Sequence, residues 1–386
     1  MARVIYITQS YSPQDRQFLE KIVEAHQVWF LPWTIEPHRS ETRPLPNGIQ
    51  ALPALNDGQQ TRLAKWAASL RRLRGHIRNI RPDIIQAGPV QTGGFVAALS
   101  GFKPLIAMSW ASDVLTLPDK KPWMGWIAQF TLRRADLVVV DCDAVRERVL
   151  SLAQLKSEQV ICFPWGIDLN VFRRKASSLP LRNRLGWESK RVVISTRRFE
   201  PIQGIMVFLE AMRRVFQRCP DARVLMVGDG SLRPQVEAFI AGHGLKDRFC
   251  LPGQVPEPAL ADYYNEADLY VSATYSDGAS ISLLQAMACG LPVIVTGGYG
   301  NLEWVLQARN GWLYPAGDTQ ALTAAIIEGL NDTAARNAMG RLNSAIVRER
   351  ANWDENVEQL FQGYSRILNG KSAPAGKPPT LEPSTL

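Results

Sequence analysis

The segment from Ser276 to Val295 constrains the fold of this chain most strongly. It contains one acidic residue in a loop of small residues, then an apolar helix pattern, a Gly-Leu-Pro stop and a β-strand run. A helix is predicted to begin near Ser280, with Ser280 or Ser282 as its cap. The unpaired amides of residues 279–282 would then form a partly positive helix end that suits a phosphate. The same pattern is typical of an ordinary helix between two strands, so alone it does not establish a function.

Short apolar runs alternate with helix patterns along most of the chain. This alternation indicates α/β domains with parallel, doubly wound sheets. Residues 32–58 are rich in Pro and in Asn-Gly and Asp-Gly pairs, and are expected to form a loop. The predicted strands are 4–8, 28–31, 83–86, 105–108, 137–140 and 160–163 in the first half, and 192–195, 223–227, 249–251, 269–272 and 292–295 in the second.

The length of 386 residues suits two domains. We expect Rossmann-like domains over 1–170 and 171–352, facing a central cleft. A terminal helix over 353–369 is expected to cross back to the first domain. The tail 370–386 has too few large apolar residues to pack and is expected to be disordered.

Cysteine and histidine usage gives no sign of a metal site. The five cysteines are scattered, mostly in or beside apolar runs, which favours reduced thiols and a cytoplasmic setting. The four histidines are dispersed and no Asp-x-Asp motif occurs, so no metal or other cofactor is expected. No run approaches the roughly 20 apolar residues of a membrane span.

The positive charge of the chain is concentrated in its first half. Residues 1–175 contain 23 Lys and Arg against 15 Asp and Glu, whereas the remainder contains 21 of each. Much of the excess lies in the predicted helix around 62–81, which is either a domain helix with a solvated basic face or a contact with an anionic membrane. The segment Lys120–Ile127 adds two Trp beside cations, a pattern that also suits an interface. Nucleic-acid binding is disfavoured because no reading motif accompanies the charge.

Seven segments of the second half together have a recognisable order. They are Pro164–Phe172, Thr196–Gly204, Leu225–Gly230, Pro252–Val255, Ala267–Val271, Ser276–Val295 and Gly311–Asp318. In this order they resemble the retaining glycosyltransferases of family 4 (glycosyl transferases group 1), which have the GT-B architecture. The resemblance covers about Pro164 to Leu330 and implies that the second domain binds a nucleotide sugar.

The resemblance implies a set of donor-binding residues. Arg198 matches the family's Arg at the donor diphosphate, while Gln203 stands where the family usually has Lys. The turn that contains Val255 matches a segment whose main chain pairs with the donor's base. The full implied set is Arg198, Gln203, Gly204, Gly228, Val255, Gly278, Ala279, Ser280, Ile281 and Gln285.

The family's central motif has two acidic residues eight positions apart, and this chain keeps only the first. Asp277 matches the carboxylate beside the donor sugar and is the implied catalytic residue. Gln285 replaces the acid that accepts hydrogen bonds from the ribose, a loss on the order of 1 kcal/mol. With Lys also absent at 203, a catalytically weak nucleotide-sugar-binding relative remains an alternative.

The first half resembles the family more loosely. In Met108–Val114, Trp110 occupies the position of the family's His, and Asp113 that of an Asp near the reacting sugar. Asp113 is therefore either a second catalytic residue or a structural helix cap. Ser112, together with Gly93 and Gly94 in the loop 88–94, is expected on the acceptor side, although that loop also fits a tight strand-to-helix turn.

The resemblance implies a retaining, metal-independent hexosyltransferase. A UDP-sugar is the favoured donor and a GDP-sugar the next. The implied acceptor is a glycan or a lipid-diphosphate sugar in cell-surface polysaccharide synthesis, with the enzyme in the cytoplasm, at the inner face of the membrane. A nicotinamide enzyme is disfavoured, because no Gly-x-Gly-x-x-Gly follows the first strand.

Overall fold

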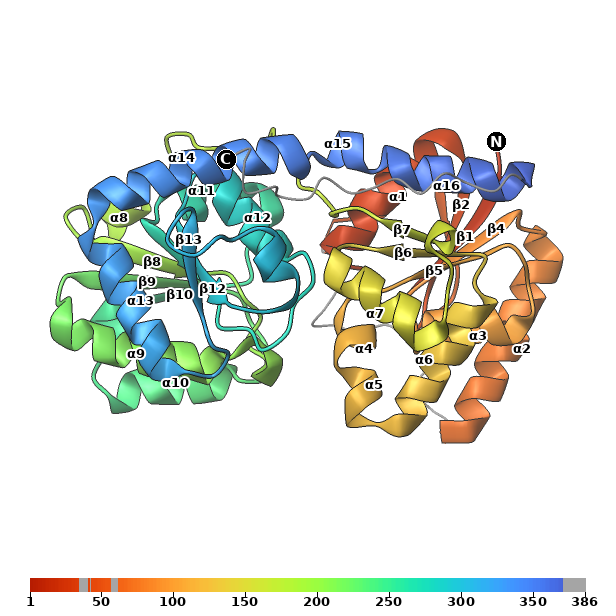
Figure 1. Ribbon diagram of the computed structural model, residues 1–386, viewed down its shortest axis with the longest axis horizontal. Helices are drawn as coiled ribbons and strands as arrows, with labels where there is room; N and C mark the ends of the chain where they lie inside the picture. The colour runs from red at the N-terminus through yellow and green to blue at the C-terminus, as the bar shows by residue number, and fades with distance from the viewer. Residues whose placement is uncertain (35–40, 42, 57–61, 371–386) are drawn as a thin grey trace. The chain divides into compact units, whose positions relative to one another are not determined.

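The computed structural model describes residues 1–34, 41, 43–56 and 62–370 (Figure 1). The chain forms two compact units, one from Met1–Pro164 with the segment that begins at Asn356, the other from Trp165–Glu355. The chain passes from the first unit to the second after Pro164, which is before the expected boundary at 170/171. It returns to the first unit after Glu355, which is beyond the expected boundary at 352/353. The expected tail lies, from residue 371 on, outside the described residues.

The first unit contains a seven-stranded parallel sheet in the order β3-β2-β1-β4-β5-β6-β7. Val28 pairs with Ile49, which adds an edge strand inside the stretch that was expected to be loop. This strand has three residues, none of them buried, so the sequence gives it no apolar signal. The strands are β1 Arg3–Thr8, β2 Gln27–Pro32, β3 Ile49–Ala51, β4 Ile84–Ala87, β5 Leu105–Met108, β6 Leu137–Val140 and β7 Val160–Cys162.

Helices cover both faces of this sheet (Figure 1). On one face, α16 contacts β6 and β7. The ring centre of His26, the residue after α1, lies 5.3 Å from the ring centre of Tyr364 on α16. On the other face α2 packs against α3, α3 against α6, and α6 against α7. The helices are α1 Pro13–Ala25, α2 Arg62–Ile80, α3 Gly93–Ser100, α4 Ser112–Leu115, α5 Leu117–Lys120, α6 Pro122–Arg134, α7 Asp143–Ala153 and α16 Glu358–Asn369.

The apolar stripe of α2 belongs to the core of the first unit. Leu73 is fully buried against Ile5, Ile85 and Val96, and Trp66 and Ile77 pack at the edge of the same cluster. The stripe therefore holds α2 on its sheet and leaves the basic residues of the helix facing outward, as in an amphipathic domain helix.

The second unit contains a six-stranded parallel sheet in the order β10-β9-β8-β11-β12-β13. Apolar clusters lie on both of its faces, one built with α9, α10 and α13 and the other with α11, α12 and α14. The two doubly wound sheets confirm the predicted fold class.

The strands of the second unit are β8 Arg191–Ser195, β9 Ala222–Val227, β10 Phe249–Gly253, β11 Leu269–Val271, β12 Val293–Thr296 and β13 Gly311–Tyr314. Its helices are α8 Leu181–Leu185, α9 Ile205–Arg218, α10 Arg233–Gly242, α11 Glu257–Asn265, α12 Ile281–Ala288, α13 Thr319–Asn331, α14 Thr333–Arg350 and α15 Trp353–Asn356.

Close backbone packing holds the C-terminal end of α12. A Cβ added at Gly340 on α14 would lie 2.1 Å from the Gly290 carbonyl oxygen, a separation that only glycine permits. Nearby, the buried Asn343 side chain donates to the Leu291 carbonyl at 2.8 Å. These contacts fix the turn between α12 and β12, and with it the helix whose other end forms the candidate site.

We expect Gly340→Ala to lower the free energy of unfolding by about 1–3 kcal/mol, because the new methyl group must displace packed backbone. Gly242→Ala on α10 is the matched control, since a Cβ there meets nothing within 4 Å. This control should be neutral or stabilising by roughly 0.5–1 kcal/mol. Urea unfolding of both variants measures the difference, and equal effects would contradict the close contact.

Candidate functional site

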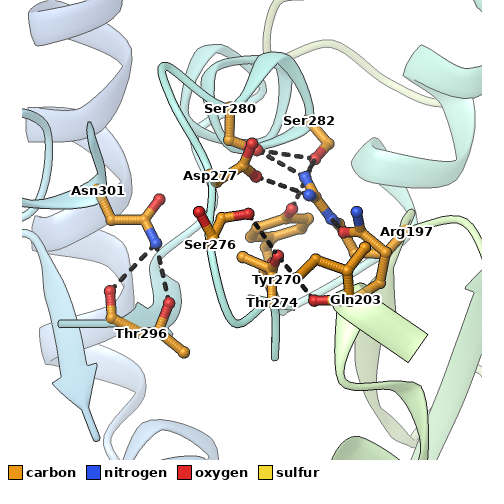
Figure 2. A network of polar contacts seen from close by, with 12 residues as sticks. Arg197, Gln203, Tyr270, Thr274, Ser276, Asp277, Ser280, Ser282, Thr296 and Asn301 are labelled. Atoms are coloured by element: carbon orange, nitrogen blue, oxygen red, sulfur yellow. Dashed lines mark hydrogen bonds and ion pairs between the residues drawn. The ribbon is translucent and has the colours of Figure 1, made fainter. Parts of the chain in front are cut away.

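A polar network lies where strands of the second sheet end (Figure 2). Arg197 follows β8, the segment 272–280 follows β11, and α12 begins at Ile281. Ligands of open α/β sheets generally bind outside these carboxyl ends. The network therefore occupies the part of this unit where a binding site is expected.

Arg197 is the centre of this network and bonds to four side chains. Its Nη2 donates to Asp277 Oδ2 at 2.6 Å, and its Nε donates to Gln203 Oε1 at 2.6 Å. Its Nη1 donates to Ser280 Oγ at 2.7 Å and to Ser282 Oγ at 2.8 Å. Figure 2 shows the guanidinium between the loop and the turn that holds Gln203.

The ion pair is largely removed from solvent. The Arg197 side chain is 10% exposed and that of Asp277 is 21% exposed. Burial alone lowers the pKa of the guanidinium, but the charge of the Asp277 carboxylate and its hydrogen bond outweigh burial and raise that pKa above its ordinary value. Arg197 therefore stays a cation, and its charge is matched by one carboxylate.

Backbone contacts shape the loop around Asp277. Gly204 has φ +63°, and a Cβ there would lie 1.9 Å from the Ala273 carbonyl oxygen. A Cβ at Gly300 would lie 2.3 Å from the Gly278 carbonyl oxygen. The loop is thus pressed between the start of α9 and the short 3-10 turn Tyr299–Glu303, which fixes the direction of its polar groups.

The cation in the network is Arg197, whereas the resemblance had assigned the donor diphosphate to Arg198, and that assignment stays a prediction. The Arg198 side chain is 49% exposed and pairs with Glu200 at 3.4 Å. The sequence offered little help, because both residues follow a strand buried on its two faces and no alternation separates inward from outward positions. The paired arginines in Thr196-Arg-Arg were the one signal that could have identified both candidates.

The other expected donor residues of the second unit lie in or beside the network. Gln203 accepts from Arg197, and the Gln285 side-chain oxygen accepts from the Tyr264 hydroxyl at 3.2 Å. Ser280 is the N-cap residue of α12, which confirms the predicted helix start, but its side chain makes no capping bond and accepts from Arg197 instead. A Cβ added at Gly228 would lie 2.5 Å from the Arg197 carbonyl oxygen. Val255 is half-buried and packs against the core of the second unit. Gly278 and Ala279 are buried, and Ile281 is half-buried.

Asp113 in the first unit is a buried structural acceptor. Its Oδ1 accepts from Ser109 Oγ at 2.7 Å and from the Trp110 amide at 3.0 Å, and its Oδ2 accepts from the Val90 amide at 2.9 Å. Burial raises its pKa to about 6, against the opposing effect of these hydrogen bonds. This geometry favours the structural alternative, and a catalytic role for Asp113 stays a prediction.

The expected acceptor-side residues lie in or beside the loops after β4 and β5, which the hydrogen bonds of Asp113 join. Ser112 is exposed and Trp110 is half-buried. Gly93 and Gly94 begin α3 and are buried, and a Cβ at Gly93 would lie 2.7 Å from the Gly88 carbonyl oxygen. The two glycines therefore serve a tight strand-to-helix turn, which was one of the two interpretations of this loop.

Two family models match the chain. "Glycosyl transferases group 1" matches residues 179–344, and "Glycosyl transferase 4-like" matches residues 34–142. The first contains the whole Arg197–Asp277 network. The chain belongs to the family 4-like glycosyltransferases with the GT-B fold.

Curated relatives of this glycosyltransferase family cover part of the chain. D-inositol 3-phosphate glycosyltransferase of Thermobispora bispora is 27% identical over 246 residues, which are 61% of this chain and 56% of the relative. The amylovoran biosynthesis glycosyltransferase AmsK of Erwinia amylovora is 33% identical over 195 residues, 48% of this chain and 47% of the relative. The matched region thus spans about half the length of these relatives.

Solved GT-B glycosyltransferases share the fold over nearly the whole chain. Sucrose-phosphate synthase from Thermosynechococcus elongatus has a TM-score of 0.79 at 19% identity, covering 96% of this chain and 100% of that one. HepE of Anabaena, in complex with UDP-glucose, has a TM-score of 0.78 at 19% identity, covering 95% and 100%. At this identity the likeness concerns the fold.

Neither a metal cluster nor a membrane span is found in the described part of this chain. Within residues 1–34, 41, 43–56 and 62–370, no three His, Cys, Asp or Glu side chains gather as metal ligands would. Over the same residues no helix combines the length and apolar character needed to cross a bilayer.

We expect Arg197→Ala to lower the free energy of unfolding by about 3–5 kcal/mol, because it leaves the Asp277 carboxylate without its partner. Arg198→Ala is the matched control at the next position and should change stability by no more than about 0.5 kcal/mol. Urea denaturation of the two variants tests this. A loss of similar size in both would contradict the assignment of Arg197 to the network.

The Asp113 carboxyl predicts a pH-dependent difference between wild type and Asp113→Asn. Its pKa of about 6 lies above its ordinary value of 3.8, so between these values the native state binds more protons than the unfolded state. Wild type therefore loses stability as pH rises through this range, and the uncharged variant does not. The stability of Asp113→Asn relative to wild type should rise by about 2–2.5 kcal/mol from about pH 4 to about pH 7. Urea unfolding across this range measures it, and a constant difference would contradict a buried, ionising Asp113.

Proposed function

We propose that this protein transfers a sugar, with retention, from a nucleotide diphosphate sugar to an acceptor hydroxyl. The observation that supports the proposal best is the Arg197–Asp277 pair at the start of α12. It places a paired cation, a carboxylate and two serine hydroxyls beside the N-terminal end of α12. These are the groups that a sugar diphosphate requires.

The donor diphosphate binds at the N-terminal end of α12 in this proposal. Helix amides favour an anion there, and the Arg197 guanidinium, which is paired with Asp277, lies beside them as a partly compensated cation. Arg198 remains the proposed second diphosphate contact from the exposed side of the turn. The nucleoside lies toward Val255 and Gln285, with the ribose near the Gln285 amide.

Asp277 faces the donor sugar. The Arg197 contact orients its carboxylate, which then offsets the positive charge that develops on the sugar ring. The C1–oxygen bond to the diphosphate breaks, and the diphosphate leaves with the electron pair. The acceptor oxygen bonds to C1 on the same face and passes its proton to the departing phosphate oxygen. Arg197 and the α12 amides stabilise the leaving charge, and we propose no resident metal for this step.

The proposed donor is a UDP-sugar, with a GDP-sugar as the next candidate. The names of relatives support a sugar alcohol phosphate or a growing polysaccharide as the type of acceptor, since they include D-inositol 3-phosphate and amylovoran enzymes. We propose a glycan or lipid-linked acceptor in cell-surface polysaccharide synthesis, and a cytoplasmic enzyme that works at the inner face of the membrane.

A catalytically weak nucleotide-sugar-binding protein is the second candidate. Gln203 and Gln285 favour it, because each puts a neutral amide where the family has a charge. The Tyr264 hydroxyl already occupies the Gln285 oxygen, which weakens the acceptor it offers to a ribose.

We expect Asp277→Asn to lower turnover at least 100-fold, which corresponds to about 2.7 kcal/mol of barrier. The physical reason is the loss of the one negative charge beside the reacting sugar. Release of the nucleoside diphosphate from a panel of UDP-, GDP- and ADP-sugars measures the rate, and thermal stabilisation by each donor measures binding.

Gln285→Glu is the comparison for this test. It restores a charged ribose acceptor, so it should tighten donor binding and leave the rate of the chemical step little changed. Full activity of Asp277→Asn would contradict the proposed role of this residue. Turnover in Gln285→Glu but not in wild type would select the second candidate.

A further inference from the structure

Three neighbouring helices on one face of the first unit are basic and contain no acidic residue. The helices α2, α3 and α6, which lie side by side on this face (Figure 1), contain eight Lys and Arg and no Asp or Glu. On the opposite face, α1 and α16 contain four acidic and three basic residues.

Two large aromatic side chains are exposed on this basic face. Trp123 is 51% exposed and Trp126 is 60% exposed, both in the first turns of α6. Lys121, directly before the helix, is exposed as well. Two exposed Trp one turn apart are unusual on a solvated surface, since Trp is normally largely buried.

One of the two exposed Trp residues, Trp126, belongs to a row of packed aromatic rings. The Trp126 ring stacks on Phe130 at 5.5 Å and meets Phe95 of α3 edge-on at 6.3 Å, and Phe95 in turn meets Trp66 of α2 at 5.2 Å. The Arg134 guanidinium lies 4.7 Å from the centre of the Phe130 ring. The row therefore connects α6 to the basic helix α2 and ends in a cation.

We propose that the face formed by α2, α3 and α6 docks on an anionic lipid bilayer, with Trp123 and Trp126 entering the interfacial region. Trp prefers the interface, where its ring is apolar and its N–H stays hydrated. The cations of α2 and α6 add attraction to anionic headgroups over a distance set by the ionic strength.

The structure changes which residues enter the bilayer. The apolar stripe of α2 is packed in the core of the first unit, so this helix contributes charge and its apolar residues do not insert. The inserting groups are instead the two Trp of α6. Bilayer docking and sugar transfer involve different residues, so either property can hold without the other.

Sedimentation of the full-length protein with vesicles tests the proposal. Wild type should bind phosphatidylcholine vesicles that contain anionic phosphatidylglycerol, bind pure phosphatidylcholine weakly, and release at high salt. Trp123→Ala with Trp126→Ala should weaken binding about tenfold or more, because the buried apolar area is lost. Leu368→Ala is the matched control, since Leu368 is 43% exposed on α16 of the opposite face.

Charge variants test the electrostatic half of the proposal. Arg71→Gln with Arg78→Gln on α2 should weaken binding roughly fivefold for each cation removed. Arg214→Gln with Arg218→Gln, two exposed positions on α9 of the second unit, should leave binding unchanged. Equal losses in the two pairs would overturn the assignment of the face.

Fluorescence quenching by bromine-labelled lipids gives a second measurement that does not depend on affinity. Quenching of wild type and its absence in the double Trp variant would support insertion of these rings. Salt-independent binding to neutral and anionic vesicles alike, or undiminished quenching in the double variant, would overturn the proposal.

Discussion

The ion pair between Arg197 and Asp277 is the contact on which the polar loop of the second unit depends. A charge that is largely removed from water requires a partner, and here each residue is the other's partner. The guanidinium also orders Gln203, Ser280 and Ser282, which come from two separate segments. One side chain thus holds the donor-facing turn, the loop and the start of α12 in a single arrangement.

Close backbone contacts make that arrangement rigid. Gly204 against Ala273, Gly300 against Gly278 and Gly340 against Gly290 leave no space for a side chain. The loop and both ends of α12 are therefore fixed by neighbouring main chain, which is less adaptable than side chains. Preorganised dipoles of this kind stabilise charge without reorganising during reaction, which is what a departing diphosphate requires.

In the first unit, buried Asp113 links two loops, whereas the basic residues of α2 and α6 face solvent. Asp113 is used internally, because its carboxylate joins the loop after β4 to the loop after β5. The basic residues of α2 and α6 are used externally, since the apolar residues of these helices already pack on the sheet and on α3. The exposed Trp123 and Trp126 follow neither pattern, and this makes them the strongest sign of a partner on that face.

The sequence by itself determined the α/β alternation, both parallel sheets and the loop around Asp277, because apolar periodicity and glycine spacing are local properties. It missed the edge strand β3, whose exposed residues give no such signal, and it selected Arg198 over Arg197. It also left open whether Asp113 was structural and whether the helix around 62–81 was a domain helix. Only the tertiary structure decided these points, because which side chain is buried, and beside which charge, depends on segments far apart in the chain.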